Sequence, residues 1–377
     1  MIIPAAVLVA LSAYLLQGDV WTFWTWYLLA LVLGVAAMPL TGRLFRRFDD
    51  KGWIFSKVTA IAITGFLTWF LVTVKILKFT AVTCVAVTVI CTVLSILLYR
   101  KEQKDGFECI PFAHLNLVYA EELLFFAFFL MWTYFAGFHP AAYGTEKFMD
   151  YGFMEAMMRS KTLPATDLWY SEGTINYYYG GQYFAVFLTK LSHTKVELTY
   201  NLMRTFVAGL AFAMPFSLVY QMMSDRMKGL QKSEKVIKGL PFAAGFTAGT
   251  AVSIAGNMHY VIYAQIIPLI EKLTGKEVSS YWFPDATRYI GYNPYREEDR
   301  TIHEFPCYSF VLGDLHAHVV NIMFVLLVIA FLYVWLRGVR KKTVPVETSM
   351  KDGKFWKEQL LMPHLLVISA LLGMFQW

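Results

Sequence analysis

Residues 177–222 read YYYGGQYFAVFLTKLSHTKVELTYNLMRTFVAGLAFAMPFSLVYQM, and this stretch decides the fold. It holds two apolar runs, Tyr177–Leu191 and Asn201–Met222, with a short polar passage between them. As a helix the first run would reach roughly 22 Å, whereas the hydrocarbon core of a bilayer is about 30 Å thick. We therefore expect Asn201–Met222 to cross a membrane and Tyr177–Leu191 to lie along its outer surface as a juxtamembrane helix.

The orientation follows from three basic loops. Lys and Arg gather at residues 41–56, 223–239 and 337–357. Short loops rich in these residues stay in the cytoplasm. Three apolar runs follow the first loop, so residues 138–175 should lie outside, and only one crossing can then precede the second loop. The alternative is that Tyr177–Leu191 is an ordinary span and that a loop elsewhere is assigned to the wrong side.

The composition is that of a membrane protein. Of 377 residues, 57% are hydrophobic and only 16% are charged, and the mean hydropathy is +0.49. The net charge of +6 is divided among the loops, which argues against nucleic acid as a partner. We predict an all-α fold, a polytopic transmembrane helical bundle forming a single domain over residues 1–377, with outer loops at 138–199 and 263–311. The expected spans are 2–17, 21–40, 57–77, 79–99, 118–137, 200–222, 240–262, 312–336 and 360–377. The last run has no polar flank, which indicates truncation at the C-terminus.

The polar passage from Glu146 to Tyr183 carries the first cluster of candidate site residues. A charge held beside lipid is costly to desolvate, so a passive membrane anchor has no use for such a loop. Asp150 and Glu146 are our candidate catalytic carboxylates, on the outer side of the membrane. The plainer interpretation is that Asp150 is an acidic residue at the start of a helix over Tyr151–Arg159.

The second cluster lies at the start of the run 312–336. Pro306–Leu336 would form one helix of about 46 Å, longer than a bilayer is thick, so its first turns should sit at the outer interface. On such a helix Asp314 and His318 share a face, and His316 points elsewhere. The pair can be a metal site, an acid–base pair, a phosphate anchor or a plain contact at a helix start. Two ligands are an incomplete set, so no residue is assigned to a metal, although a divalent ion such as Mn or Mg stays open as a cofactor.

Further candidate substrate-binding residues lie near the same interface. They are Arg159, Arg204, Arg288, Tyr178, Tyr179 and Glu304. The guanidinium fork of the arginines matches phosphate oxygens, but each arginine can equally be an interface residue that snorkels. For the tyrosines, an aromatic belt at the membrane surface is the simpler explanation.

Three stretches of this chain resemble a known family. They are EKFMDYGFMEAMMRS (146–160), PATDLWYSEGTINYYYGGQY (164–183) and HEFPCYSFVLGDLHAH (303–318). These are similar to the "YYY" family of uncharacterised multi-spanning membrane proteins of bacteria and archaea, and Tyr177–Tyr179 match the tyrosine run behind that name. The family in turn distantly resembles the type C (GT-C) glycosyltransferases. Those enzymes use an acidic residue in the first long outer loop, which juxtamembrane helices follow.

The resemblance implies a GT-C-like bundle in which Asp150 or Glu146 acts on the acceptor and Arg204 approaches the donor phosphate. The implied function is transfer of a sugar from a polyprenyl-phosphate donor to an acceptor on the outer face of the cytoplasmic membrane. The protein would be a multi-pass protein of the cell membrane, with this donor and membrane lipid as partners and an acceptor that the sequence does not identify. The chain departs from those enzymes in having four candidate spans before the acidic loop, where they usually have one.

We expect Asp150 to take the proton of the acceptor hydroxyl as that hydroxyl attacks the anomeric carbon, with Glu146 orienting the acceptor. Asp314 and His318 would complete the pocket, while cationic side chains or a metal stabilise the leaving phosphate. The alternative is a membrane transporter or lipid flippase without chemistry, which would want polar residues at mid-membrane depth. A structural scaffold is a third interpretation, and it leaves both outer clusters unexplained.

Overall fold

The computed structural model describes residues 2–340 apart from residues 105, 107, 145, 229–233, 289, 293 and 299. Over these residues the chain is built of helices, with two isolated β-bridges in place of any sheet. The main helices are α1 (Ile2–Leu16), α2 (Val20–Leu44), α3 (Trp53–Thr73), α4 (Ala81–Lys104), α5 (Leu115–Ala136), α6 (Lys147–Arg159), α7 (Gly180–Ser192), α8 (Val196–Met227), α9 (Glu234–Ser253), α10 (Ile267–Leu273), α11 (Pro306–Leu312) and α12 (Ala317–Arg340). This confirms the all-α fold.

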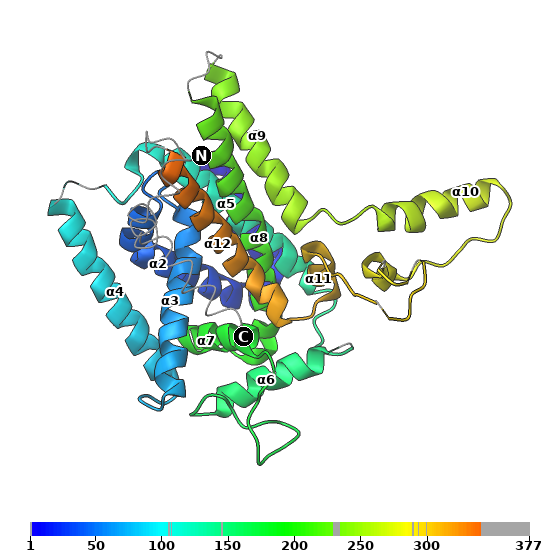
Figure 1. Ribbon diagram of the computed structural model, residues 1–377, viewed down its shortest axis with the longest axis horizontal. Coiled ribbons are helices and arrows are strands. Elements are labelled where there is room, and N and C mark those ends of the chain that lie inside the picture. The colour runs from blue at the N-terminus through cyan, green and yellow to red at the C-terminus, as the bar shows by residue number, and fades with distance from the viewer. Residues whose placement is uncertain are drawn as a thin grey trace, which may run out of the picture.

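Six helical segments of the described chain are long and apolar enough to cross a membrane, as a polytopic bundle requires. The first is a 42-residue segment, Ile3–Leu44, in which a 3-10 turn joins α1 to α2. The others are formed by α3, α4, α5, α8 and α12. In Figure 1, α3, α5, α8 and α12 run alongside one another, and α6 and α7 lie across one end of them.

Helix α8 forms the centre of the bundle, and nearly all of its apolar stretch is buried. Helix α9 can approach it closely because two glycines, one turn apart, face it. A Cβ added at Gly245 would lie 2.6 Å from the carbonyl oxygen of Phe216, and one at Gly249 would lie 2.7 Å from that of Phe212. Small residues at such positions let the backbones of membrane helices pack closely.

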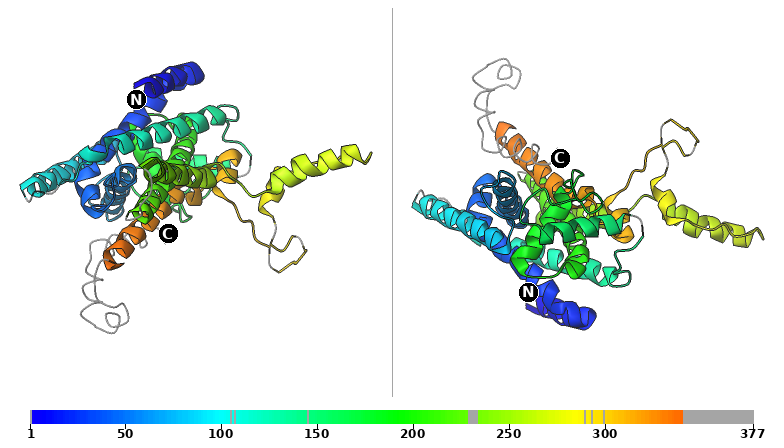
Figure 2. Two further views of the ribbon diagram at one scale, coloured as in Figure 1. Left: turned by 90° about the horizontal axis from the view of Figure 1, so that it is seen from above. Right: turned by 90° about the horizontal axis from the view of Figure 1, so that it is seen from below.

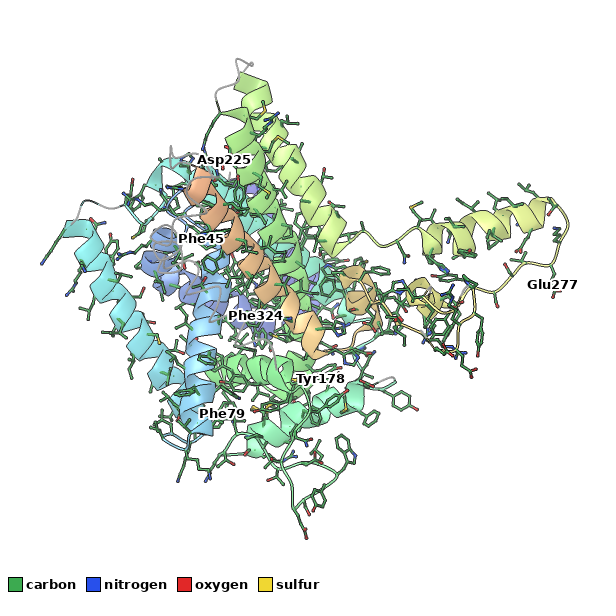
Figure 3. All side chains as sticks on the ribbon, viewed as in Figure 1. Phe45, Phe79, Tyr178, Asp225, Glu277 and Phe324 are labelled. Atoms are coloured by element: carbon green, nitrogen blue, oxygen red, sulfur yellow. The ribbon has the colours of Figure 1, made fainter. Side chains whose placement is uncertain are left out.

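Described residues that flank or belong to the three basic loops lie together at one end of the bundle. Arg337 of α12 forms an ion pair with Asp225 of α8 at 2.7 Å, and Lys228 after α8 pairs with Asp49 of the α2–α3 turn at 3.2 Å. We call this the basic end, and we call the opposite end, covered by α6 and α7, the site end. Figure 3 labels Asp225 at the first and Tyr178 at the second.

The short apolar run after the tyrosines folds as predicted into a helix too short to span a bilayer. Helix α7 begins at Gly180, lies crosswise to α8 in Figure 1, and packs between α6 and the ends of α3 and α12. Its side chains from Tyr183 to Thr189 are buried on both faces of the helix. It is therefore an internal part of the site end, and it does not present one face to solvent as a surface helix would.

Two predicted helices have different ends in the structure. The single helix expected over Pro306–Leu336 is wrong, because Gly313 adopts the left-handed conformation (φ +87°) and ends α11, and α12 begins only at Ala317. The helix of the expected span 240–262 ends earlier, at Ser253, and the segment that follows, with α10, extends away from the bundle in Figures 1 and 2. The expected span 360–377 lies outside the described residues.

Candidate functional site

Asp150 is the most deeply buried of the predicted site residues. It occupies the first turn of α6, where a carboxylate suits the helix dipole, and its exposed fraction is 0%. Gln182 of α7 donates from Nε2 to Asp150 Oδ1 at 2.7 Å and to the Leu315 carbonyl oxygen at 3.0 Å. One amide thus ties together α6, α7 and the break between α11 and α12.

His316 lies at the centre of a ring of carboxylates. Its Nδ1 is 3.1 Å from Asp150 Oδ2, and its Nε2 is 3.6 Å from Asp314 Oδ2 and 3.9 Å from Glu146 Oε2. Burial alone would lower the pKa of His316, but the contact with Asp150 and the charges of Asp314 and Glu146 outweigh it, so the pKa is raised. The imidazole is therefore biased toward its cationic form.

The predicted pairing of Asp314 with His318 is wrong. It assumed a continuous helix, whereas residues 313–316 are not helical, and this turns His316 toward Asp150 and Asp314. His318 instead pairs with Glu304, with 3.2 Å between His318 Nε2 and Glu304 Oε2. Contacts with His318 and Ser309 outweigh the effect of burial and lower the pKa of Glu304. The second cluster therefore splits into two pairs.

Two cationic side chains meet at Gly313. A Cβ added there would collide with Arg204 Nη1 and would lie 3.4 Å from Lys147 Nζ. The buried Arg204 guanidinium donates to the Phe310 carbonyl oxygen at 3.1 Å and to Asn201 Oδ1 at 2.6 Å, and its Nε is buried without a partner. Burial lowers the pKa of Lys147, and the charge of Asp314 acts in the opposite direction. Gly313 thus has two roles: it adopts the left-handed conformation that ends α11, and its lack of a side chain leaves room for Arg204 and Lys147.

An apolar cavity of about 890 Å³ adjoins this cluster. It lies between α3, the segment 176–184 and the first turns of α12, and its walls include Trp69, Phe184 and Phe324. In Figure 3, Phe324 lies in the bundle near the site end. The cavity shares its rim with the polar cluster, because Tyr178 lines the cavity and also lies near Glu146 and Asp150. Burial and the Tyr177 hydroxyl raise the pKa of the Tyr178 phenol most, and the charges of Glu146 and Asp150 raise it further.

The remaining predicted residues lie at the rim of the cavity or away from the cluster. Tyr179 lines the cavity, and its hydroxyl accepts a hydrogen bond from Trp69 Nε1 at 3.1 Å. Arg159, at the far end of α6, forms an exposed pair with Glu155 at 3.3 Å. Arg288 places its guanidinium 4.4 Å from the centre of the Trp282 ring. The structure therefore brings Arg204 into the cluster but neither of the other two arginines.

Sequence reasoning did not identify Lys147, Gln182 and Tyr200 as part of the site. Tyr200 accepts a hydrogen bond from the backbone N–H of Leu315 at 3.3 Å and so helps to hold the break before α12. Gln182 was recognisable, because it is a neutral polar residue near the start of the otherwise apolar stretch of α7. Lys147 and Tyr200 carried no such signal, since charged and aromatic residues are common near membrane interfaces.

The described part of the chain contains no group of three His, Cys, Asp or Glu side chains arranged to hold a metal ion. The polar atoms around His316 are nevertheless suited to other chemistry. An accessible carboxylate, an imidazole with a raised pKa and the basic side chains of Arg204 and Lys147 stand together beside an apolar cavity.

The fold and this cluster define a multi-pass membrane protein with a polar site at one end of its helical bundle. The chain belongs to a family described as uncharacterized membrane proteins (DUF2298), whose model matches residues 63–377. This confirms the resemblance to an uncharacterised family of multi-spanning membrane proteins. Comparisons with curated proteins and with solved structures found no match.

Proposed function

We propose that the protein is a membrane glycosyltransferase of the GT-C type, which moves a sugar from a polyprenyl-phosphate donor to an acceptor hydroxyl at the site end. The observation that carries this proposal is the junction of the carboxylate–imidazole cluster, the cations at Gly313 and the apolar cavity. Such a donor has a reacting sugar, a phosphate and an isoprenoid chain, and each would find a matching environment. By the positive-inside rule, the site end faces away from the cytoplasm.

The different exposure of Glu146 and Asp150 suggests a different role for each carboxylate in the reaction. Glu146 is 55% exposed and its Oε2 lies 3.9 Å from His316 Nε2, so Glu146 can reach an acceptor hydroxyl, whereas Asp150 is fully buried. In the proposed step the acceptor oxygen bonds to the anomeric carbon and gives its proton to Glu146. Asp150 acts as a positioning residue that orients His316. The sequence-based expectation differs, because it has Asp150 as the base and Glu146 as the residue that orients the acceptor.

The departing group in this step is the polyprenyl phosphate. The bond between the anomeric carbon and the phosphate oxygen breaks, and its electron pair stays on that oxygen. Lys147 and the cationic His316 are suited to stabilise the new negative charge, because fixed cations in a site of low dielectric stabilise developing charge strongly. Arg204 is fixed by hydrogen bonds to the Phe310 carbonyl oxygen and Asn201, and its positive charge beside Gly313 would further stabilise the phosphate.

The test is release of sugar from a panel of labelled polyprenyl-phosphate sugars by the intact protein in bilayers, with and without manganese. Glu146→Gln should reduce release by about 10²–10⁴-fold, the usual contribution of a general base. Glu155→Gln is the matched control, since Glu155 lies on α6, the helix that directly follows Glu146, but pairs with the exposed Arg159. Asp150→Asn should in addition move the pH profile of release, because His316 loses the contact that raises its pKa. Equal release by all variants would refute the proposal.

The apolar cavity gives one reason to keep a lipid transporter as the second candidate, because such a cavity can hold a lipid chain whether or not chemistry follows. Vesicles that contain the intact protein would distinguish the two. Movement of the labelled lipid between leaflets with no sugar released, and equal movement in Glu146→Gln, would favour the transporter.

A further inference from the structure

At the basic end of the bundle, several acidic side chains form ion pairs with Lys or Arg. Three carboxylates there have a cationic partner. The pairs are Asp49–Lys228 at 3.2 Å, Asp225–Arg337 at 2.7 Å and Glu122–Lys57 at 2.8 Å. Two deeper carboxyl groups, Asp50 and Glu121, differ from these.

Asp50 lies in the turn between α2 and α3 and is 1% exposed. Its Oδ2 accepts a hydrogen bond from the backbone N–H of Trp53 at 2.9 Å and one from the Ser217 hydroxyl at 3.3 Å. Two donors therefore converge on one oxygen of Asp50, which favours the ionised carboxylate.

Glu121 of α5 is 0% exposed, and both of its carboxyl oxygens are buried without accepting a hydrogen bond. Its carboxyl group lies within hydrogen-bonding reach of that of Asp50. The Ser217 hydroxyl is close to both groups but donates to Asp50. Within the described residues no basic side chain contacts either carboxyl.

Two ionised carboxylates cannot share such a site. Each would lack solvent, and like charges in contact disfavour ionisation of one member of the pair. Burial raises the pKa of Asp50, even though the backbone N–H groups of Gly52 and Trp53 act against this. A single proton removes both difficulties, because it halves the charge and turns one unpartnered oxygen of Glu121 into a donor.

The other titratable groups nearby leave this charge uncompensated. Glu122 adds a further negative charge from α5, and Lys57 of α3 neutralises only that one. Tyr220 of α8 lies near both Asp50 and Glu121, and its phenol brings no positive charge. Within the described parts of the chain, no basic side chain forms an ion pair with Asp50 or Glu121.

We propose that Asp50 and Glu121 form a proton-binding site, in which the protonated Glu121 donates to the ionised Asp50 and thereby joins the α2–α3 turn to α5 and α8. The ligand is a proton, taken up at the basic end, far from the polar cluster at the site end. The site would add a buried hydrogen bond between these three segments to the ion pairs that already join them.

The test is infrared spectroscopy of the intact protein in bilayers, which distinguishes the C=O stretch of a protonated carboxyl from that of a carboxylate. The wild-type protein should show a buried protonated carboxyl at neutral pH, and this band should be absent from Glu121→Gln. The neighbouring Asp49→Asn is the matched control and should keep the band, since Asp49 is already paired with Lys228. If Glu121→Gln does not fold, Asp50→Asn should move the pH at which the band disappears, because the adjacent charge is gone.

Two outcomes would overturn the proposal. One is a wild-type spectrum at neutral pH that lacks the band of a protonated carboxyl. A band that is present but is altered by neither Glu121→Gln nor Asp50→Asn would count equally against the proposal. The other is stabilisation by sodium over choline that depends on Glu121, which would make the pair a sodium site. By contrast, a wild-type melting temperature that falls as the pH rises, with a clearly shallower fall in Glu121→Gln, would support the shared proton.

Discussion

The substitution Gly313→Ala tests the link between the helix break and the cations of the site. Gly313 has φ +87°, and a Cβ there would collide with Arg204 Nη1. A non-glycine residue in this conformation costs about 1–2 kcal/mol. Moving the guanidinium also removes its hydrogen bond to the Phe310 carbonyl oxygen, and a bond of that charged type contributes about 1.5–3 kcal/mol. We therefore expect a loss of about 3–5 kcal/mol in the free energy of unfolding.

The assay is thermal unfolding of the purified intact protein in detergent, followed by tryptophan fluorescence. Gly180→Ala is the matched control, because Gly180 begins α7 with no atom within 4 Å of an added Cβ and with no positive φ. The control should melt within a few degrees of the wild type. If Gly313→Ala and Gly180→Ala melt at the same temperature, neither the strain at Gly313 nor the close approach of Arg204 contributes to stability, and the reasoning fails.

Three further predictions concern charged groups at both ends of the bundle. Lys57 is fully buried and its Nζ lies 2.8 Å from Glu122 Oε2, so Lys57→Met should reduce the free energy of unfolding by about 3–5 kcal/mol, measured in the same melts, because it leaves a partly buried carboxylate unpaired. Arg159→Ala should leave both melting temperature and sugar release unchanged, since its contact with Glu155 is an exposed surface pair. The raised pKa of His316 stabilises the folded protein below the ordinary histidine pKa of about 6.5, and this contribution should be lost as the pH rises through the folded-state value.

Controls for these predictions use the partner residues. Glu122→Gln added to Lys57→Met should restore part of the lost stability, because the unpaired charge is then gone. Melting temperatures of His316→Gln across neutral pH should depend less on pH than those of the wild type. A contribution of His316 that grows as the pH rises over the same window would contradict a raised pKa for its imidazole.

Much of the helical architecture could be predicted from apolar run length and basic loops. The run ending at Leu191 is too short to cross a bilayer, and the structure forms a separate short helix there. The ends of the helices were harder to predict, because hydropathy indicates which residues can lie in lipid and not where the helical conformation ends. Helix α8 extends from Val196 to Met227, beyond the apolar run Asn201–Met222 at both ends, since polar residues continue the helix outside the apolar stretch.

The site was predictable in its residue types but not in its pairings. Asp150, Asp314 and His316 were all identified as candidates, but the pairing of Asp314 with His318 rested on a helix that Gly313 interrupts. A single glycine in an apolar stretch is a weak signal, because helices tolerate glycine at a cost of about 1 kcal/mol. The contact of Asp150 with His316 depends on how α6 packs near α12, which no local pattern encodes.

The hydrogen bond from Gln182 to Leu315 also has a consequence for biosynthesis, because these residues are 133 positions apart. At a synthesis rate of about 5–20 residues per second, α7 waits roughly 7–27 s for the segment that covers it. During that interval its apolar side chains lack their final neighbours, and α7 is too short to be held across the bilayer. The site therefore closes only after α12 has left the ribosome, and a nascent chain paused between the two helices should be especially vulnerable to quality-control proteases at α7.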